Sequence, residues 1–231
     1  MEVVGVLFLV GFFAWAIVAG QNEKKERLAT LATLGKQLGG GNDEMSVWGE
    51  IAGTRVVMRY TSRGSGKHKT SWTEADAEFP AKYPLAFFVQ KHGWGDSSKI
   101  ARGDMVDVIV GDRAFDQRFR VEAAPADVAR VLLHDRARAY LTHLSDALWF
   151  EITTVADGER PVLRIAIRSW LTDPNTAMAA IETIASIASK VREAYVAVQD
   201  AADVVDQGSP YRPMLDDTRA TSAGAASTRK R

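Results

Sequence analysis

The pattern of hydrophobic and polar positions begins with one long apolar run. Residues 3–20, VVGVLFLVGFFAWAIVAG, contain no ionisable group. Because charge is costly in hydrocarbon and about 20 apolar residues cross a bilayer core, the run predicts a transmembrane anchor over residues 1–20, with residues 3–20 in contact with the lipid bilayer. The alternatives are a buried core helix and a signal peptide cleaved after Gly20, although Met1-Glu2 lacks the Lys or Arg of a secretory signal.

Basic residues flank this run on one side only. None precedes it, whereas Lys24, Lys25, Arg27 and Lys36 follow it closely. The positive-inside rule counts basic residues near the ends of a span. It therefore predicts a single-pass protein with its N-terminus outside and its C-terminal domain in the cytoplasm.

Residues 21–42 predict a juxtamembrane helix and a Gly-rich linker. Leucines at positions 28, 31, 34 and 38 recur at helical spacing and form a narrow apolar stripe. The stripe predicts either packing on the chain's own domain or a seam for self-association. Residues 39–42, GGGN, break the helix and are expected to form a hinge or linker, so that the folded domain begins near Asp43.

Residues 43–206 predict an α+β domain. Strand-like patterns predict strands at 54–60, 69–79, 106–110 and 118–123, and an antiparallel pair at 148–154 and 162–169. The apolar run after Pro84 predicts a buried strand at 85–90. Helical spacing predicts helices at 125–132, 136–144 and 173–206, the last one opened by Asp173-Pro174. Strands and helices in this order indicate one domain of mostly antiparallel strands with a long C-terminal helix.

Composition narrows the function classes. The chain has no cysteine, which excludes a disulfide scaffold, a thiolate zinc site and a cysteine nucleophile. Its 29 basic residues balance 29 acidic ones, which argues against a nucleic-acid partner. Residues 207–231 have five basic and two acidic residues and no periodicity, and they predict a disordered basic tail.

Candidate chemistry is sparse. Residues 64–67, GSGK, resemble part of a phosphate-binding loop, but position 61 is not glycine, position 68 is not Ser or Thr, and the segment joins two predicted strands. A hairpin turn is therefore expected there. The four histidines, at positions 68, 92, 134 and 143, lack metal-ligand spacing. No catalytic residue, metal or cofactor is predicted.

One aromatic residue is a candidate for binding. Trp94 stands between Gly93 and Gly95, a context that predicts exposure. Exposed aromatic side chains are common in recognition surfaces. Trp94 is therefore the single binding residue that the sequence suggests.

A family resemblance lies in residues 104–133. The segment holds Phe115-Asp116, Phe119 and Val121, the pattern FDxxFxV, followed by an acidic helix start at Ala126-Asp127 and by Leu132-Leu133. It resembles an uncharacterised group of bacterial single-pass membrane-anchored proteins in which a helix, a strand pair and a long helix follow. The resemblance implies a packing pattern and a bacterial source, hence the inner (plasma) membrane, and it implies no activity.

Two classes of function fit these patterns. The first is a membrane-anchored interaction or sensing module, with a protein partner or a second copy of the chain as its ligand. The second is a membrane-tethered enzyme or small-ligand-binding domain with a site assembled from distant residues. The lack of a recognisable catalytic constellation favours the first class.

Overall fold

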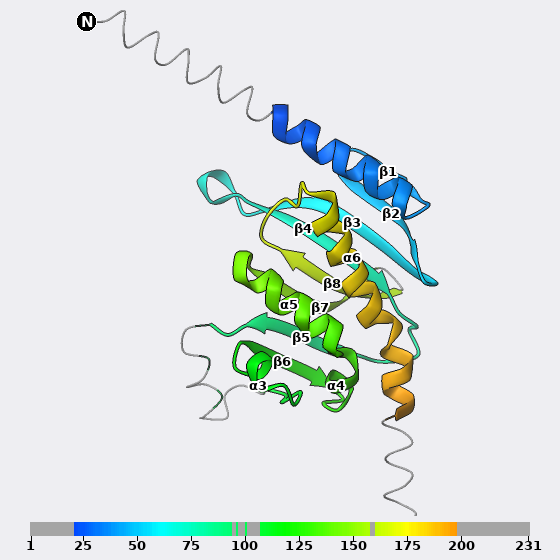
Figure 1. Ribbon diagram of the computed structural model, residues 1–231, viewed down its shortest axis with the longest axis vertical. Coiled ribbons are helices and arrows are strands. Elements are labelled where there is room, and N and C mark those ends of the chain that lie inside the picture. The colour runs from blue at the N-terminus through cyan, green and yellow to red at the C-terminus, as the bar shows by residue number, and fades with distance from the viewer. Residues whose placement is uncertain (1–20, 94–95, 97–99, 101–106, 158–159, 198–231) are drawn as a thin grey trace, which may run out of the picture.

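The computed structural model describes residues 21–93, 96, 100, 107–157 and 160–197 (Figure 1). Within these residues, eight strands form one antiparallel sheet in the order β1-β2-β3-β4-β8-β7-β5-β6. The strands are β1 (Gly41–Asn42), β2 (Ser46–Ile51), β3 (Thr54–Arg63), β4 (Thr70–Glu78), β5 (Ala86–Lys91), β6 (Phe119–Ala124), β7 (Phe150–Asp157) and β8 (Arg160–Ile167). The prediction of an α+β domain with antiparallel strands is confirmed.

The longer helices cover one face of this sheet (Figure 1). They are residues 21–37, α5 (Asp135–Ala147), α6 (Pro174–Ser189) and residues 191–197, while α3 (Arg113–Asp116) and α4 (Val128–Leu132) are short. The alternation in β3 explains the layering, because Val56, Met58 and Tyr60 are buried on the helix side. The side chains between them point to the opposite face, which we call the open face.

Helix α6 begins as the sequence predicts and ends earlier. The Asp173 carboxylate caps it by accepting a hydrogen bond from the Thr176 N–H at 2.8 Å, and Pro174 occupies the first turn. The helix breaks at Lys190, because the Ser189 hydroxyl donates to the Ser186 carbonyl and the Lys190 N–H bonds to Ile187 instead. A second helical segment covers residues 191–197, and the rest of the predicted helix lies outside the described residues.

One predicted strand is absent in the part that the structure describes. Residues 107–110 run beside β6 without strand geometry. The Val108 N–H donates to the Val121 carbonyl at 2.8 Å, but the Val121 N–H donates to the Asp107 carboxylate at 2.9 Å. A side chain therefore takes the place of a main-chain partner, and the ladder does not continue.

The helix at residues 21–37 belongs to the domain. Leu31, Leu34 and Leu38 are buried in the core, so the stripe packs on the chain's own domain. The predicted linker is a close turn that leads directly into β1. A Cβ atom on Gly40 would lie 1.8 Å from the Trp48 carbonyl oxygen, so only glycine fits there. The fold therefore begins well before Asp43.

The predicted anchor and tail are not part of the described structure. Among the described residues, no helix is both long enough and apolar enough to cross a bilayer. Residues 1–20 and 198–231 lie outside that part of the chain. The transmembrane anchor and the disordered basic tail therefore stay predictions.

Candidate functional site

The residues that the sequence singled out do not form one site. Trp94 lies outside the described residues, and its binding role stays a prediction. As predicted, the GSGK segment is the tip of a hairpin, which joins β3 and β4, and a 3-10 turn covers Gly66–His68. Gly64 and Gly66 have φ values of 90° and 56°, a left-handed backbone that glycine adopts readily. No three His, Asp or Glu side chains in the described part of the chain group as metal ligands.

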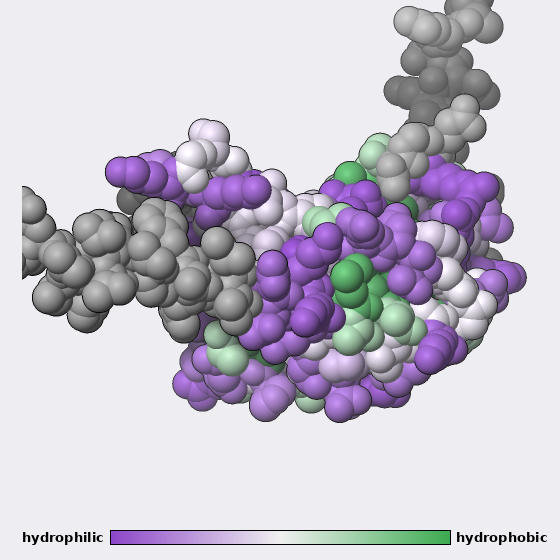
Figure 2. All heavy atoms as spheres, turned by 90° about the horizontal axis from the view of Figure 1, so that it is seen from above, coloured by the Kyte–Doolittle hydropathy of each residue, from purple (hydrophilic) through white to green (hydrophobic). Residues whose placement is uncertain are grey.

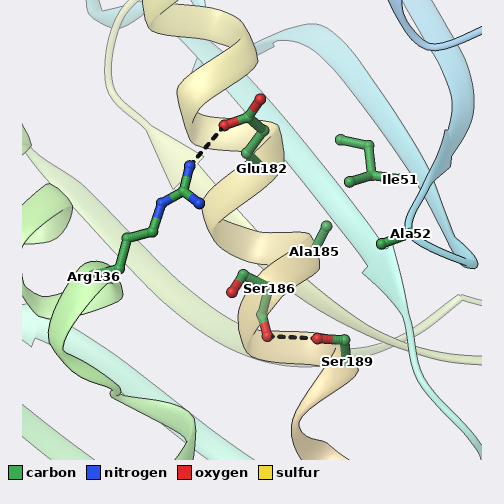
Figure 3. A pocket seen from close by; sticks show the side chains of 7 residues that line it. All are labelled: Ile51, Ala52, Arg136, Glu182, Ala185, Ser186 and Ser189. Carbon is green, nitrogen blue, oxygen red and sulfur yellow. Dashed lines mark hydrogen bonds and ion pairs between the residues drawn. The ribbon is translucent and has the colours of Figure 1, made fainter.

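A shallow groove lies on the helix side of the molecule (Figure 3). Residues of α6 form its floor, between Arg136 of α5 and the β2–β3 turn, and its volume is about 340 Å³. In Figure 3, Arg136 and Glu182 point toward one another and form an ion pair at 3.2 Å. The residues around the groove are Ile51, Ala52, Arg136, Glu182, Ala185, Ser186 and Ser189.

Ser186 of this groove contacts a histidine. The His134 Nε2 and Ser186 Oγ atoms are 2.9 Å apart, which is the distance expected of a nucleophile and its base. However, His134 is also the N-cap of α5, where its Nδ1 accepts the Ala137 N–H at 3.4 Å. The ring proton therefore lies on Nε2, and the imidazole donates to Ser186 instead of removing its proton.

The charge state of His134 fits this capping role. Burial, together with the positive charges of Lys190, Arg136 and Arg138, lowers the pKa of His134 below its usual 6.5. A neutral imidazole keeps the Nδ1 lone pair that the cap requires. The pair is therefore a structural contact between α5 and α6 and not a catalytic dyad.

The open face carries a network of arginine–carboxylate pairs. It comprises Arg59, Arg63, Glu74, Asp76, Glu151 and Arg164, which we call the open-face network. Glu74 and Asp76 are the most enclosed members, with side chains only 8% and 4% exposed. Arg164 binds Asp76 through two hydrogen bonds of 2.7 and 2.8 Å, and Arg63 bridges Glu74 and Glu151 at 2.9 and 3.0 Å.

The network lowers the pKa of Glu74. Burial alone would raise the pKa of Glu74, but hydrogen bonds from Arg63 and Thr61 and the charge of Arg164 outweigh it and lower this pKa. Arg63 also stacks on the Trp72 ring at 4.1 Å, and Trp72 meets Trp149 edge to face. These groups brace four strands against one another, and their charges are paired within the domain.

The sheet is split between β5 and β7. Their ladder joins Phe88–Gln90 to Glu151–Thr153 and ends there, although β7 continues to Asp157 in pairing with β8. Where the two strands separate, the Thr154 hydroxyl accepts a hydrogen bond from the Phe87 N–H at 3.0 Å. This side-chain contact replaces the next main-chain hydrogen bond of the β5–β7 ladder. Within the described structure, the main-chain groups of residues 154–156 that face away from β8 have no strand partner.

Two hollows meet at this split. Their volumes are about 420 and 440 Å³, and Ala86 and Thr154 line both. One also contains Glu122 and the other Arg160. The remaining wall residues are mostly small or apolar, namely Ala81, Leu85, Phe87, Phe88, Ala123, Ala124, Thr153, Val155, Ala156 and Pro161. An opening with small walls, and with main-chain groups that lack a strand partner, suits another extended backbone better than it suits catalysis.

Comparisons with known proteins found no match. No family model matches the chain, and no curated protein or solved structure does so either. The resemblance of residues 104–133 to a group of membrane-anchored proteins therefore stays a prediction.

Proposed function

We propose that this chain is a single-pass membrane-anchored interaction module whose domain faces the cytoplasm and binds an extended segment of a partner protein in the β5–β7 split. The observation that carries the proposal is the interrupted ladder between β5 and β7. The membrane anchor rests on the apolar run of residues 3–20, and the orientation rests on the basic residues that follow it. Tethering to a membrane raises the local concentration, so a modest peptide affinity suffices.

Strand addition is the mode of binding that this geometry favours. An extended peptide beside β7 would use main-chain hydrogen bonds for affinity and side-chain pockets for specificity. Residues 154–156 offer about 10 Å of strand, enough to pair with three residues of a ligand. Ala86, Ala124 and Ala156 have short side chains that allow a second backbone to come close.

The charged residues at the split suggest the character of the ligand. Glu122 lies at one hollow and Arg160 at the other. Glu122 is held by Arg120 at 3.0 Å, and Arg160 by Glu78 at 3.2 Å, so neither charge is directed wholly at a ligand. We therefore expect a mainly apolar peptide with small residues at its centre, and only a weak preference for charge at its ends.

The alternative is an enzyme or a small-ligand-binding domain. The lining of the split contains hydroxyl groups from Thr153 and Thr154, but no described lining residue is a histidine, serine or aspartate. The serine–histidine contact between Ser186 and His134 has the wrong tautomer for nucleophilic activation. The described residues therefore supply a binding surface without a base, nucleophile and oxyanion site together.

A substitution that fills the split tests the proposal. Ala86 is exposed and lines both hollows, so Ala86→Trp blocks the split without entering the core. Ala139 is an exposed residue of α5 away from the split, and Ala139→Trp is the matched control. Peptides are first selected from a display library with the full chain in detergent micelles, and their affinities for both variants are then measured.

We expect Ala86→Trp to weaken peptide binding by about tenfold or more, equivalent to about 1.4 kcal/mol, and Ala139→Trp to leave it unchanged. Equal affinity for the wild type and for Ala86→Trp would contradict the proposal. A small molecule that co-purifies with the wild type and is absent from Ala86→Trp would support the small-ligand alternative instead.

A further inference from the structure

The helix at residues 21–37 runs antiparallel to β3. Near the C-terminal end of the helix, Leu38 lies against Gly49, where an added Cβ would be 2.6 Å from the leucine Cβ, and Gly49 pairs with Val56 early in β3. Near its N-terminal end, Arg27 stacks on Trp170 at 3.9 Å and on Tyr60 late in β3 at 5.8 Å. The N-terminal end of the helix and the tip of the β3–β4 hairpin therefore point the same way (Figure 1).

The hairpin reaches at least as far as the helix does. The Trp170 indole N–H donates to the Thr61 carbonyl at 3.3 Å, which places Thr61 level with Arg27. From Arg27 back to Gln21 the helix rises by about 9 Å at 1.5 Å per residue. From Thr61 to the end of β3 at Arg63 the extended chain advances by about 7 Å, and the turn that follows carries the tip further. The tip therefore comes about level with residue 21, where the predicted anchor ends (Figure 1).

The tip is basic and unneutralised. Lys67, His68 and Lys69 are exposed, and no acidic residue occurs between Ser62 and Thr73. Among the described residues, neither lysine of the tip has an ion-pair partner. The tip lies at the left of Figure 1 and stands out from the body as a hydrophilic projection in Figure 2.

The helix end has a small excess of the same charge. Exposed Lys24 and Lys25 stand beside exposed Glu23 and Glu26, and Lys24 also pairs with Glu44 at 3.8 Å. Arg63, at the base of the hairpin, is different because Glu74 and Glu151 neutralise it. The basic side chains that remain available at this end of the domain are therefore those of the tip and of the helix.

We propose that the β3–β4 tip docks on anionic lipid headgroups of the bilayer in which the chain is anchored. The inference rests on the proposed membrane anchor, because the anchor sets where the bilayer surface lies. Lipid phosphates at an anionic surface attract Lys and Arg within a Debye length, and each lysine strengthens the contact by about fivefold. A second point of contact would hold the domain in one orientation, with the helix axis and the hairpin both directed at the membrane.

The absence of cysteine allows a site-specific test on the full chain. Ser65→Cys places a fluorescent label at the apex of the tip, and Ala81→Cys places it on the exposed connection beyond the opposite end of β4. Each labelled chain is reconstituted in vesicles of phosphatidylcholine, alone or mixed with phosphatidylglycerol. Quenching by a headgroup nitroxide then reports which label meets the surface, and alkaline carbonate extraction reports whether the chain is integral.

We expect strong quenching at residue 65 and weak quenching at residue 81 in vesicles that contain phosphatidylglycerol. High salt, or Lys67→Gln with Lys69→Gln, should reduce the contact at residue 65, by about fivefold per lysine in its equilibrium constant. An integral chain with equal quenching at both positions would overturn tip docking and leave the anchor intact. A chain that carbonate extracts would overturn the anchor, and tip docking with it.

Discussion

Replacing Glu74 with glutamine tests whether the open-face network stabilises the domain. The carboxylate accepts hydrogen bonds from Arg63 at 2.9 Å and Thr61 at 3.1 Å and lies 3.5 Å from Arg164. Breaking a fully buried ion pair costs about 3–5 kcal/mol, and a hydrogen bond to a charged group contributes about 1.5–3 kcal/mol. Because glutamine keeps one acceptor oxygen and Arg63 retains Glu151, we expect a loss of about 2 kcal/mol.

The change should appear in thermal unfolding and in its pH dependence. A loss of about 2 kcal/mol lowers the Tm of a domain of this size by about 4–8 °C, measured by circular dichroism on the full chain in detergent micelles. The folded pKa of Glu74 is below its ordinary value of 4.5. The stabilisation that ionised Glu74 gives is therefore fully present above pH 4.5 and is lost as the pH falls through the folded pKa. The Tm of Glu74→Gln should consequently fall less steeply with decreasing pH than the Tm of the wild type.

A matched control separates the network from a general charge effect. Glu50 is exposed on β2, so Glu50→Gln should change stability by less than about 0.5 kcal/mol and leave the acid profile unchanged. If Glu74→Gln melts within 1–2 °C of the wild type (roughly what a 0.5 kcal/mol change gives) and keeps the same acid profile, the network does not stabilise the fold as described.

Three further predictions concern the helices and the turn. The pKa of His134 is lowered in the folded state, so the stability of the wild type should fall as the pH drops below the usual 6.5. His134→Asn keeps an N-cap but does not titrate, so its Tm should depend less on pH between 6.5 and 5 than the Tm of the wild type does. Gly40→Ala should lower the free energy of unfolding in urea by about 3 kcal/mol, because its Cβ would clash with the Trp48 carbonyl. An unfolding midpoint equal to that of the wild type would support the linker interpretation instead. Asp173→Ala should lose the cap of α6 and about 1 kcal/mol, and an unchanged Tm would argue against this cap.

Local patterns predict most of the secondary structure. Strand alternation identifies β3, β4, β6 and the β7–β8 pair, because a sheet with one covered face requires a period of two, and the apolar run after Pro84 identifies β5. Asp173-Pro174 marks the start of α6, because capping and a first-turn proline act within one helical turn. These features depend on neighbours in sequence, so the sequence alone is sufficient for them.

The features that the sequence misses depend on distant partners. Charged residues occupy every second or fourth position of β3 (Arg59, Arg63) and of β4 (Glu74, Asp76), which indicates a charged sheet face. The sequence does not show, however, that the pairing of β4 with β8 brings Arg164 to Asp76 from 88 residues away. The β5–β7 split follows from where two strands diverge, and no residue type marks it. The glycines at residues 39–41 have the composition of a linker, and only the structure shows that Trp48 packs against them.

The face of the molecule in Figure 2 is mainly hydrophilic. In Figure 2, hydrophilic residues cover most of the face shown, and hydrophobic residues form a small patch. Among the described residues, the exposed large hydrophobic side chains are Met45, Trp48, Ile109 and Val196, and they are scattered along the chain. Single exposed apolar residues are normal. The main-chain groups at the split therefore offer a more specific binding feature than the apolar surface does.

Hydrogen exchange on the complex with a selected peptide tests the central claim most directly. Within the split, the amides of Thr154 and Ala156 face away from β8 and lie beyond the end of the ladder between β7 and β5. The peptide should protect these two amides by at least tenfold, and Ala86→Trp should abolish this protection. Protection confined to the groove between α5 and α6, or no protection in residues 154–156, would contradict peptide binding in the split.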